Sequence, residues 1–183
     1  DGVGRIMTAD AAGNIVEVAD DGGTIRYTLR NDGQPSAVSC GDYVTSFSYD
    51  KYGRRISITD PSAGTQTDTT SWSSDGTSVR VQTNPNGKIT TWYDKYGRTV
   101  KVDREGEYST FYVYDSYGRL QSESSTNGTA KSYTYDELDR PVTEREIVPD
   151  GKWLLKTYGY ASGSRLESTR FDSQNGNIAT EHY

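Results

Sequence analysis

The amino-acid sequence predicts an all-β protein, an antiparallel meander of repeated β-hairpins with about 21 residues per repeat. Three observations predict this class: glycines recur at a nearly constant step, bulky residues alternate between them, and the composition favours strands. The step is about 11 residues, and a turn of three or four residues leaves about seven for each segment. Segments of this length suit strands and are too short for stable helices.

The predicted turns follow one another at this step along the whole chain. Their centres fall near residues 4, 13, 22, 33, 41, 53, 64, 76, 87, 97, 106, 118, 128, 139, 151, 163 and 176, a mean step of 10.75 residues. Every centre except 139, where an aspartate stands, is a glycine. Glycine adopts positive φ without steric cost, so it marks the place where the chain reverses.

The segments between these turns alternate bulky and polar residues, as half-buried strands do. Bulky pairs two residues apart occur, in chain order, at Val16/Val18, Phe47/Tyr49, Ile56/Ile58, Val79/Val81, Val100/Val102, Tyr112/Tyr114, Tyr133/Tyr135 and Tyr158/Tyr160. Each pair places two bulky side chains on one face of its strand.

The composition supports strands with thin packing. Leu, Ile, Val and Phe together account for 29 of the 183 residues, below the level of about 20% at which disorder becomes a serious alternative. Against disorder stand 15 Tyr, 3 Trp and 22 Thr, which are residue types that favour strands. We therefore expect aromatic packing between strands in place of a thick aliphatic core.

A six-residue motif, Tyr-Asp-x-x-Gly-Arg, recurs at every second turn. Its last three clear copies begin 21 residues apart, and the 44-residue gap before them leaves room for a degenerate copy at residues 72–77. A weak copy lies at Tyr160 and Arg165. The motif residues are Tyr49, Asp50, Gly53 and Arg54; Tyr93, Asp94, Gly97 and Arg98; Tyr114, Asp115, Gly118 and Arg119; and Tyr135, Asp136 and Arg140, with Asp139 in the glycine position of the last copy.

The motif has a local structural explanation. Its central residues predict a hairpin loop in which a type I turn is followed by a left-handed residue, the position that glycine fills. The aspartate can accept hydrogen bonds from the turn backbone, and its charge faces the arginine across the loop. The tyrosine precedes the aspartate in each copy, so the tyrosines should line up as a ladder across consecutive hairpins. We expect that ladder to replace part of the missing core.

In this pattern the chain resembles the YD-repeat (Rhs repeat) family, which includes Rhs effectors, bacterial wall-associated proteins, the C subunits of insecticidal toxin complexes, and teneurins. The clear copies span residues 49–140, and degenerate repeats extend the likeness over residues 1–48 and 141–183. The resemblance implies that the hairpins pair edge to edge into a twisted, curved ribbon or partial shell. It also implies a structural role for each repeat.

From this resemblance we expect a single repeat array, residues 1–183, that is a segment of a larger secreted or bacterial cell-surface protein. Its function would be that of a structural, encapsulating scaffold, non-catalytic in itself. The expected partners are the rest of the parent chain or an encapsulated polypeptide. The first and last strands, at residues 1–6 and 178–183, would have unpaired edges, which favours edge-to-edge self-association.

Charge and chemistry exclude several function classes. The net charge of −6 and the pI near 4.8 give no basic surface for nucleic acid. No apolar run approaches the roughly 20 residues of a membrane-spanning helix, so we expect no membrane insertion. The single histidine, His182, and the single cysteine, Cys40, lack the partners that catalysis or metal binding needs. We therefore predict no enzyme, no cofactor and no metal site.

An alternative function uses the aromatic residues. Trp92 lies one residue away from the ladder position, which places it on the face opposite the ladder, and Trp153 lies in a later segment. Exposed on a sheet, such rings could stack on sugars or contact a partner. The alternative is therefore an extracellular module that binds a glycan or a surface protein through Trp92 and Trp153.

Overall fold

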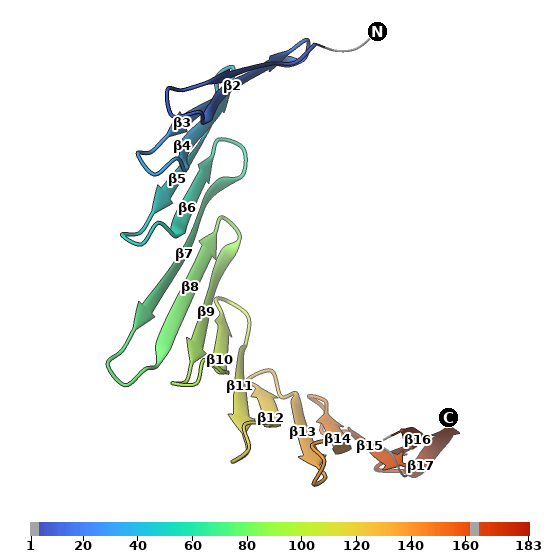
Figure 1. Cartoon of the computed structure of the whole chain (residues 1–183). Coiled ribbons are helices and arrows are strands. Elements are labelled where there is room, and N and C mark those ends of the chain that lie inside the picture. The colour runs from blue at the N-terminus through green and yellow to red at the C-terminus, as the bar shows by residue number, and fades with distance from the viewer. Residues whose placement is uncertain (1–3, 162–164) are drawn as a thin grey trace. The chain divides into compact units, whose positions relative to one another are not determined.

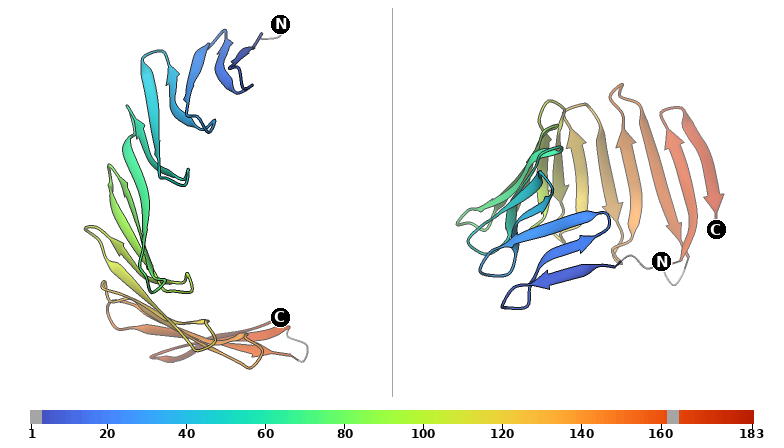
Figure 2. Two further views of the ribbon diagram at one scale, coloured as in Figure 1. Left: turned by 60° about the vertical axis from the view of Figure 1, so that its left-hand side comes forward. Right: turned by 90° about the horizontal axis from the view of Figure 1, so that it is seen from above.

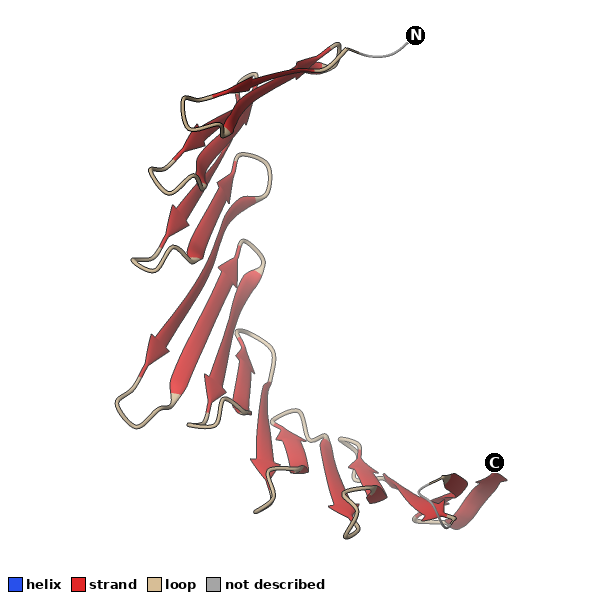
Figure 3. Cartoon of the chain, in the orientation of Figure 1, coloured by secondary structure: helices blue, strands red, loops and turns tan. Residues whose placement is uncertain are grey.

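The computed structural model describes residues 4–161 and 165–183, and strands joined by short turns make up this part of the chain (Figure 1). No helix occurs among the described residues (Figure 3). The strands are β1 Ile6–Ala9, β2 Ile15–Asp20, β3 Gly23–Leu29, β4 Pro35–Cys40, β5 Tyr43–Tyr49, β6 Arg55–Asp60, β7 Gly64–Trp72, β8 Ser78–Asn84, β9 Gly87–Tyr93, β10 Thr99–Arg104, β11 Ser109–Tyr114, β12 Leu120–Ser125, β13 Ala130–Tyr135, β14 Pro141–Ile147, β15 Trp153–Tyr160, β16 Leu166–Ser173 and β17 Gly176–His182.

These strands confirm the predicted all-β meander. Every strand pair with a defined register joins consecutive strands, and all are antiparallel. The predicted turn centre at 163 and residues 1–3 of the predicted N-terminal edge lie outside the described residues. Within the described ranges, no helix has the length and apolar character needed to cross a membrane.

The chain divides into two compact units. Unit 1 comprises Asp1–Ser71 and Arg80–Ile89, and unit 2 comprises Trp72–Val79 and Thr90–Tyr183. Strands β1 to β6 belong to unit 1. Strands β10 to β17 belong to unit 2, where they lie side by side in chain order (Figure 2).

A register shift accompanies the motif tyrosine. Val113 pairs with Ser122 on the next strand, whereas Tyr114 pairs with Leu120, so one residue of β12 between these two pairs has no partner of its own. The same shift occurs at Tyr135. An extra residue opposite a regular strand is a β-bulge, and a bulge beside a turn is what a loop ending in a left-handed residue produces.

The predicted turn near residue 22 is confirmed, with residues 21 and 22 between the paired Asp20 and Gly23. The positive φ there belongs to Gly23, at 138°, and not to Gly22. The reason is the register: Asp20 pairs with Gly23, so a two-residue turn closes the hairpin and the special backbone angle falls on its last residue.

The two faces of unit 2 carry different side chains. Tyr112 pairs with Glu123, Glu123 with Lys131, and Lys131 with Glu146, so these side chains form one row across four strands. We call the face with this row the tyrosine face, because Tyr112 and Tyr114 both lie on it. The opposite face carries Phe111 paired with Lys101.

The packing is thin, as the composition predicts. Among the described residues no hydrophobic side chain is fully buried, and the buried positions are polar, such as Ser78 and Thr169. Many large apolar side chains are substantially exposed. The sheet therefore depends on its backbone hydrogen bonds and on contacts between neighbouring strands more than on a core.

Candidate functional site: the repeated turn and its tyrosine ladder

The turns that follow strands β1, β3, β5, β7, β9, β11 and β13, which we call motif turns, share one backbone construction. In each, the first residue donates its N–H to the carbonyl of the residue four positions later at 2.8–3.0 Å, and the residue three positions later donates back at 2.9–3.2 Å. This construction is seen in the turns that begin at Asp10, Arg30, Asp50, Ser73, Asp94, Asp115 and Asp136. The predicted type I turn followed by a left-handed residue is therefore confirmed.

The motif aspartate accepts hydrogen bonds from residues of its own turn. In the third clear copy, Asp115 Oδ1 accepts hydrogen bonds from the N–H groups of Tyr117 and Arg119, both at 2.9 Å. Its Oδ2 accepts a further bond from Arg119 Nε at 2.7 Å. Asp50, Asp94 and Asp136 make the same three contacts. At Asp10, Asn14 takes the place of the arginine.

The glycine position has the left-handed backbone that the motif predicts. Gly97 has φ of 79° and Gly118 has φ of 85°. At the equivalent place in the fourth copy, Asp139 has φ of 60°, a positive value that is rare for a residue with a side chain. Replacement of glycine by aspartate has therefore kept the shape of the turn.

The tyrosines form the predicted ladder and reach back to the preceding repeat. The Tyr114 hydroxyl donates to the carbonyl oxygen of Thr99 at 2.8 Å, and the Tyr135 hydroxyl donates to that of Leu120, also at 2.8 Å. Tyr49 and Tyr160 make equivalent bonds to proline carbonyls at 2.6 and 2.7 Å. Each hydroxyl thus donates to the carbonyl oxygen of the first residue after the preceding motif turn.

The motif arginines complete a contact between successive hairpins. The guanidinium carbon of Arg98 lies 4.6 Å from the centre of the Tyr114 ring, and that of Arg119 lies 4.7 Å from the Tyr135 ring. Arg140 lies 4.3 Å from the Tyr160 ring in the same way. Each arginine therefore binds the aspartate of its own turn and stacks on the tyrosine of the next repeat. We call this arrangement the arginine clamp.

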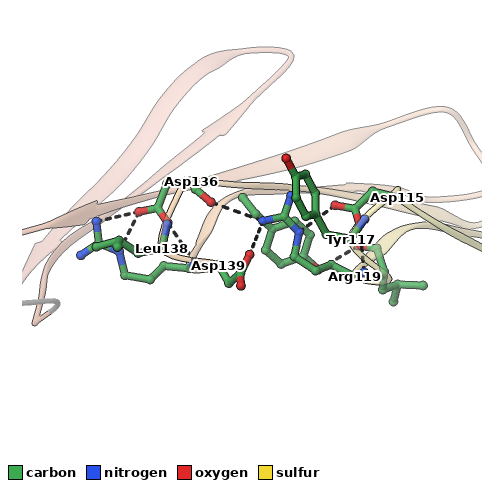
Figure 4. A network of polar contacts seen from close by, with 9 residues as sticks. Asp115, Tyr117, Arg119, Asp136, Leu138 and Asp139 are labelled. Carbon is green, nitrogen blue, oxygen red and sulfur yellow. Dashed lines mark hydrogen bonds and ion pairs between the residues drawn. The ribbon is translucent and has the colours of Figure 1, made fainter.

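The fourth copy adds an ion pair to this arrangement (Figure 4). Arg119 Nη1 donates to Asp139 Oδ1 at 2.6 Å and to the carbonyl oxygen of Asp136 at 3.3 Å, while its Nε stays on Asp115. Asp139 is 74% exposed, so water screens the added pair. The aspartate in the glycine position thus gains a partner from the preceding repeat.

The clamps lower the pKa values of their carboxyl groups. The hydrogen bond from the Arg140 side chain is the main reason that the pKa of Asp136 lies below its ordinary value of 3.8. At Asp115, desolvation raises the pKa, but the bonds from Arg119 and Tyr117 outweigh it and leave the pKa lowered. Burial raises the pKa of the Tyr114 and Tyr135 hydroxyls, although the nearby arginine opposes this. The clamp is therefore built from charged aspartates and neutral tyrosines at neutral pH.

The candidate binding aromatics are partly covered by cations. Lys101 Nζ lies 4.4 Å from the Trp92 ring centre, and the Arg145 guanidinium carbon lies 5.4 Å from that of Trp153. Lys101 also lies over Phe111, at 5.5 Å, which agrees with the expectation that Trp92 occupies the face opposite the ladder.

The reactive residue types are scattered. Cys40 is exposed and has a free thiol. In the part of the chain that the structure describes, no cluster of three or more His, Cys, Asp or Glu side chains could hold a metal ion.

Two features of the site were not anticipated from the sequence. One is the stacking of an arginine on the tyrosine of the following repeat. Its signal in the sequence was the 16-residue spacing from Arg98 to Tyr114 and from Arg119 to Tyr135, which lengthens to 20 residues from Arg140 to Tyr160. The other is the exposed residue at the tip of each clear motif turn. These tip residues are Tyr52, Tyr96, Tyr117 and Leu138.

Comparison with known proteins gives one family match. The model of the family described as teneurin YD-shell matches residues 7–177. The comparison with curated proteins gave no match.

Among solved structures, the crystal structures of TcdB2-TccC3-TEV and TcdB2-TccC3-Cdc42 are similar to this chain. The alignments cover 98% of the chain at 14% and 15% sequence identity, with TM-scores of 0.37 and 0.36. The chain spans 13% of the length of each of those proteins.

Proposed function

Because this chain belongs to the teneurin YD-shell family, we propose that it is a structural segment in the wall of a larger YD-repeat shell. The observation that carries the proposal is the arginine clamp, which joins each hairpin of the regular region to the next through Arg98, Arg119 and Arg140. In this proposal the repeats of residues 1–183 act as one array, and the motif residues serve structure and not catalysis.

The clamp suits a wall that is one sheet thick. Such a wall cannot rely on a buried core, and the described residues include no fully buried hydrophobic side chain. A contact that repeats with the hairpins stabilises a ribbon of any length, because each repeat needs only its neighbours. The proposal therefore explains why aromatic, acidic and basic residues recur at fixed places in each repeat.

The partners that fit this role are the remainder of a longer parent chain and a polypeptide enclosed by the shell. We place the protein outside the cell, either secreted or at a bacterial surface. The absence of an enzymatic role is part of the proposal. This part of the proposal rests on the repeated aspartates. In each of the four clear copies, the aspartate carboxylate accepts a hydrogen bond from the arginine of its own turn.

The alternative function, a glycan- or protein-binding module that uses Trp92 and Trp153, has less support. A ring that binds a ligand needs an open face, and each of these rings has a neighbouring cation over it.

Edge-to-edge self-association also stays a prediction. Strand β17 pairs with β16, and its Ile178 side chain is well exposed.

The test uses the parent protein. Electron microscopy should show β10 to β17 as part of a curved wall that encloses a cavity. A double variant, Arg98→Ala with Arg119→Ala, should weaken the wall, so that an added protease digests the enclosed polypeptide faster than in the parent. Tyr43→Ala, an exposed position outside the clamps, serves as the control. A map in which both faces of the segment lie outside any enclosure would refute the proposal.

A further inference from the structure

A shallow groove of about 370 Å³ lies on the tyrosine face of unit 2, over strands β10 to β14. Its floor is the row Tyr112, Glu123, Lys131 and Glu146, which the strand register places side by side. Its volume falls at the lower end of the range of about 300–1,000 Å³ that is usual for small-molecule sites. None of these floor residues takes part in the arginine clamps.

One end of the groove is formed by the turn between β10 and β11. Tyr108 lies there with 37% of its surface exposed, and the Arg104 guanidinium carbon lies 5.6 Å from its ring centre. Together with Tyr112 on the floor, Tyr108 gives the groove two aromatic rings within a short distance along the sheet. Flat apolar surfaces therefore lie beside polar groups.

The charges in the groove balance, but one of them lacks a partner. Lys131 Nζ lies 3.6 Å from Glu146 Oε1, so these two side chains form an ion pair. Glu123 has no hydrogen-bond or ion-pair partner among the described residues. After burial, the Glu123 carboxylate is the next cause of the raised pKa of about 12 at Tyr133, which lies farther along the same face. The groove thus contains a carboxylate that is available to accept hydrogen bonds from a ligand.

The chemistry of the lining indicates the class of ligand. Two cationic and two anionic side chains cancel, so the groove gives neither an anion nor a cation a net attraction. Hydroxyl and amide groups supply both donors and acceptors; they belong to Thr110, Ser125, Asn127 and Thr129. A sugar offers hydroxyl groups that both donate and accept, together with apolar C–H faces that pack on aromatic rings.

We propose that this groove binds a neutral carbohydrate. Glu123 accepts hydrogen bonds from sugar hydroxyls, Lys131 and Arg104 donate to sugar oxygens, and the rings of Tyr112 and Tyr108 contact the apolar face of a sugar ring. This site differs from the tryptophan sites of the alternative function in its residues and in its face of the sheet. It is also independent of the shell proposal, because a wall segment needs no ligand.

The test uses the 183-residue chain and saturation-transfer NMR with three neutral probes: cellotetraose, chitotetraose and lactose. We expect transfer to at least one probe. Glu123→Gln keeps the shape of the side chain and removes its charge, so it should weaken binding by roughly tenfold, as expected for loss of a charged hydrogen bond. Tyr112→Ala should abolish measurable binding.

Two control variants show whether binding depends on the groove itself. Tyr43→Ala removes an exposed aromatic ring in unit 1 and should leave binding unchanged. Trp153→Ala tests the opposite face and should also leave it unchanged. Circular dichroism of every variant confirms that the fold is retained. The proposal is overturned if no neutral probe binds, if Glu123→Gln and Tyr112→Ala bind as the parent does, or if only Trp153→Ala loses binding.

Discussion

The motif turns are uniform, whereas the turns that follow even-numbered strands differ from one another. Every described motif turn with defined bonds has the same backbone construction. The turns that follow even-numbered strands, which we call return turns, vary. Asp20 pairs with Gly23 across two residues, and the Ser125 to Thr129 turn has three residues between its ends. In the β10–β11 turn the bonds join Arg104 to Glu107 and to Tyr108.

This difference shows where the repeat is constrained. A motif turn carries the clamp, so its shape must present the aspartate to its own arginine and the arginine to the next tyrosine. The return turn from Val148 to Lys152 has the same backbone hydrogen bonds as a motif turn. Its Asp150, however, forms an ion pair with Lys152 of the same turn and accepts a hydrogen bond from the Lys152 N–H. Return turns need only to reverse the chain, so their length and residue types can vary.

The largest effect should come from protonating all the clamps together. The pKa values of Asp50, Asp94, Asp115 and Asp136 are all lowered from 3.8, so their contribution to stability is fully present above that pH. It is lost as the pH falls through the folded-state values. Urea unfolding from pH 7 to pH 2 should give a nearly constant unfolding free energy down to about pH 5 and a steep fall below 3.8.

Amide signals sharpen this prediction. During acidification, the N–H signals of Tyr96 and Tyr117, which donate to Asp94 and Asp115, should shift together. Stability that stayed constant to pH 2 would show that the clamps contribute nothing.

The second largest loss of stability is expected from a substitution at the left-handed glycine of a motif turn. Gly97→Val forces a β-branched residue to φ of 79°, which should cost about 1–3 kcal/mol. Gly151→Val, in a return turn with φ of 82°, is the matched control, because a Cβ at either position meets no atom within 4 Å. Thermal unfolding should show a larger loss for Gly97→Val, since it also disturbs the Asp94–Arg98 clamp. Equal losses would mean that only the local backbone matters.

A smaller effect is expected from a single aspartate. Asp115→Ala removes the acceptor of three hydrogen bonds and should lower the melting temperature. Asp115→Asn keeps one acceptor oxygen and should lower it less. Asp150→Ala, which removes two bonds inside a return turn, provides the comparison and should have the smallest effect of the three variants. A reversed order would contradict the special role of the motif turns.

The smallest change should come from Asp139→Gly, because two effects oppose each other. Glycine relieves the positive φ of 60°, while the substitution removes the ion pair with Arg119. Salt screens that exposed pair, so the variant should gain stability relative to the parent as the salt concentration rises. A stability difference that does not change between low and high salt would show that the ion pair is without effect.

Much of the fold could be predicted from the sequence because its signals are local and repeated. The regular spacing of the glycines located the turns. The Tyr-Asp-x-x-Gly-Arg motif located the hydrogen bonds that the aspartates accept within those turns. Asp139 could be placed in the left-handed position from register alone. Each of these inferences needs only residues that lie within a few positions of one another.

The contacts between repeats could not be predicted in the same way. Stacking of Arg119 on Tyr135 depends on the pairing register and on the bulge beside the turn. The groove depends on the alignment of Tyr112, Glu123 and Lys131 across separate strands, which a shift of one residue would abolish. The only sequence signal for the stacking is the 16-residue spacing from Arg98 to Tyr114 and from Arg119 to Tyr135, and the groove has none.

Native-state hydrogen exchange tests the central claim, that the motif turns hold successive hairpins together, most directly. The informative amides are those of Asp94, Asp115 and Asp136, which donate across motif turns, and those of Ser125 and Val148, which donate across return turns of the same backbone construction. If the clamps hold the ribbon, the first group exchanges more slowly, and Arg98→Ala speeds exchange at both Asp94 and Asp115. Equal exchange in the two groups, with no effect of Arg98→Ala on Asp115, would contradict the account.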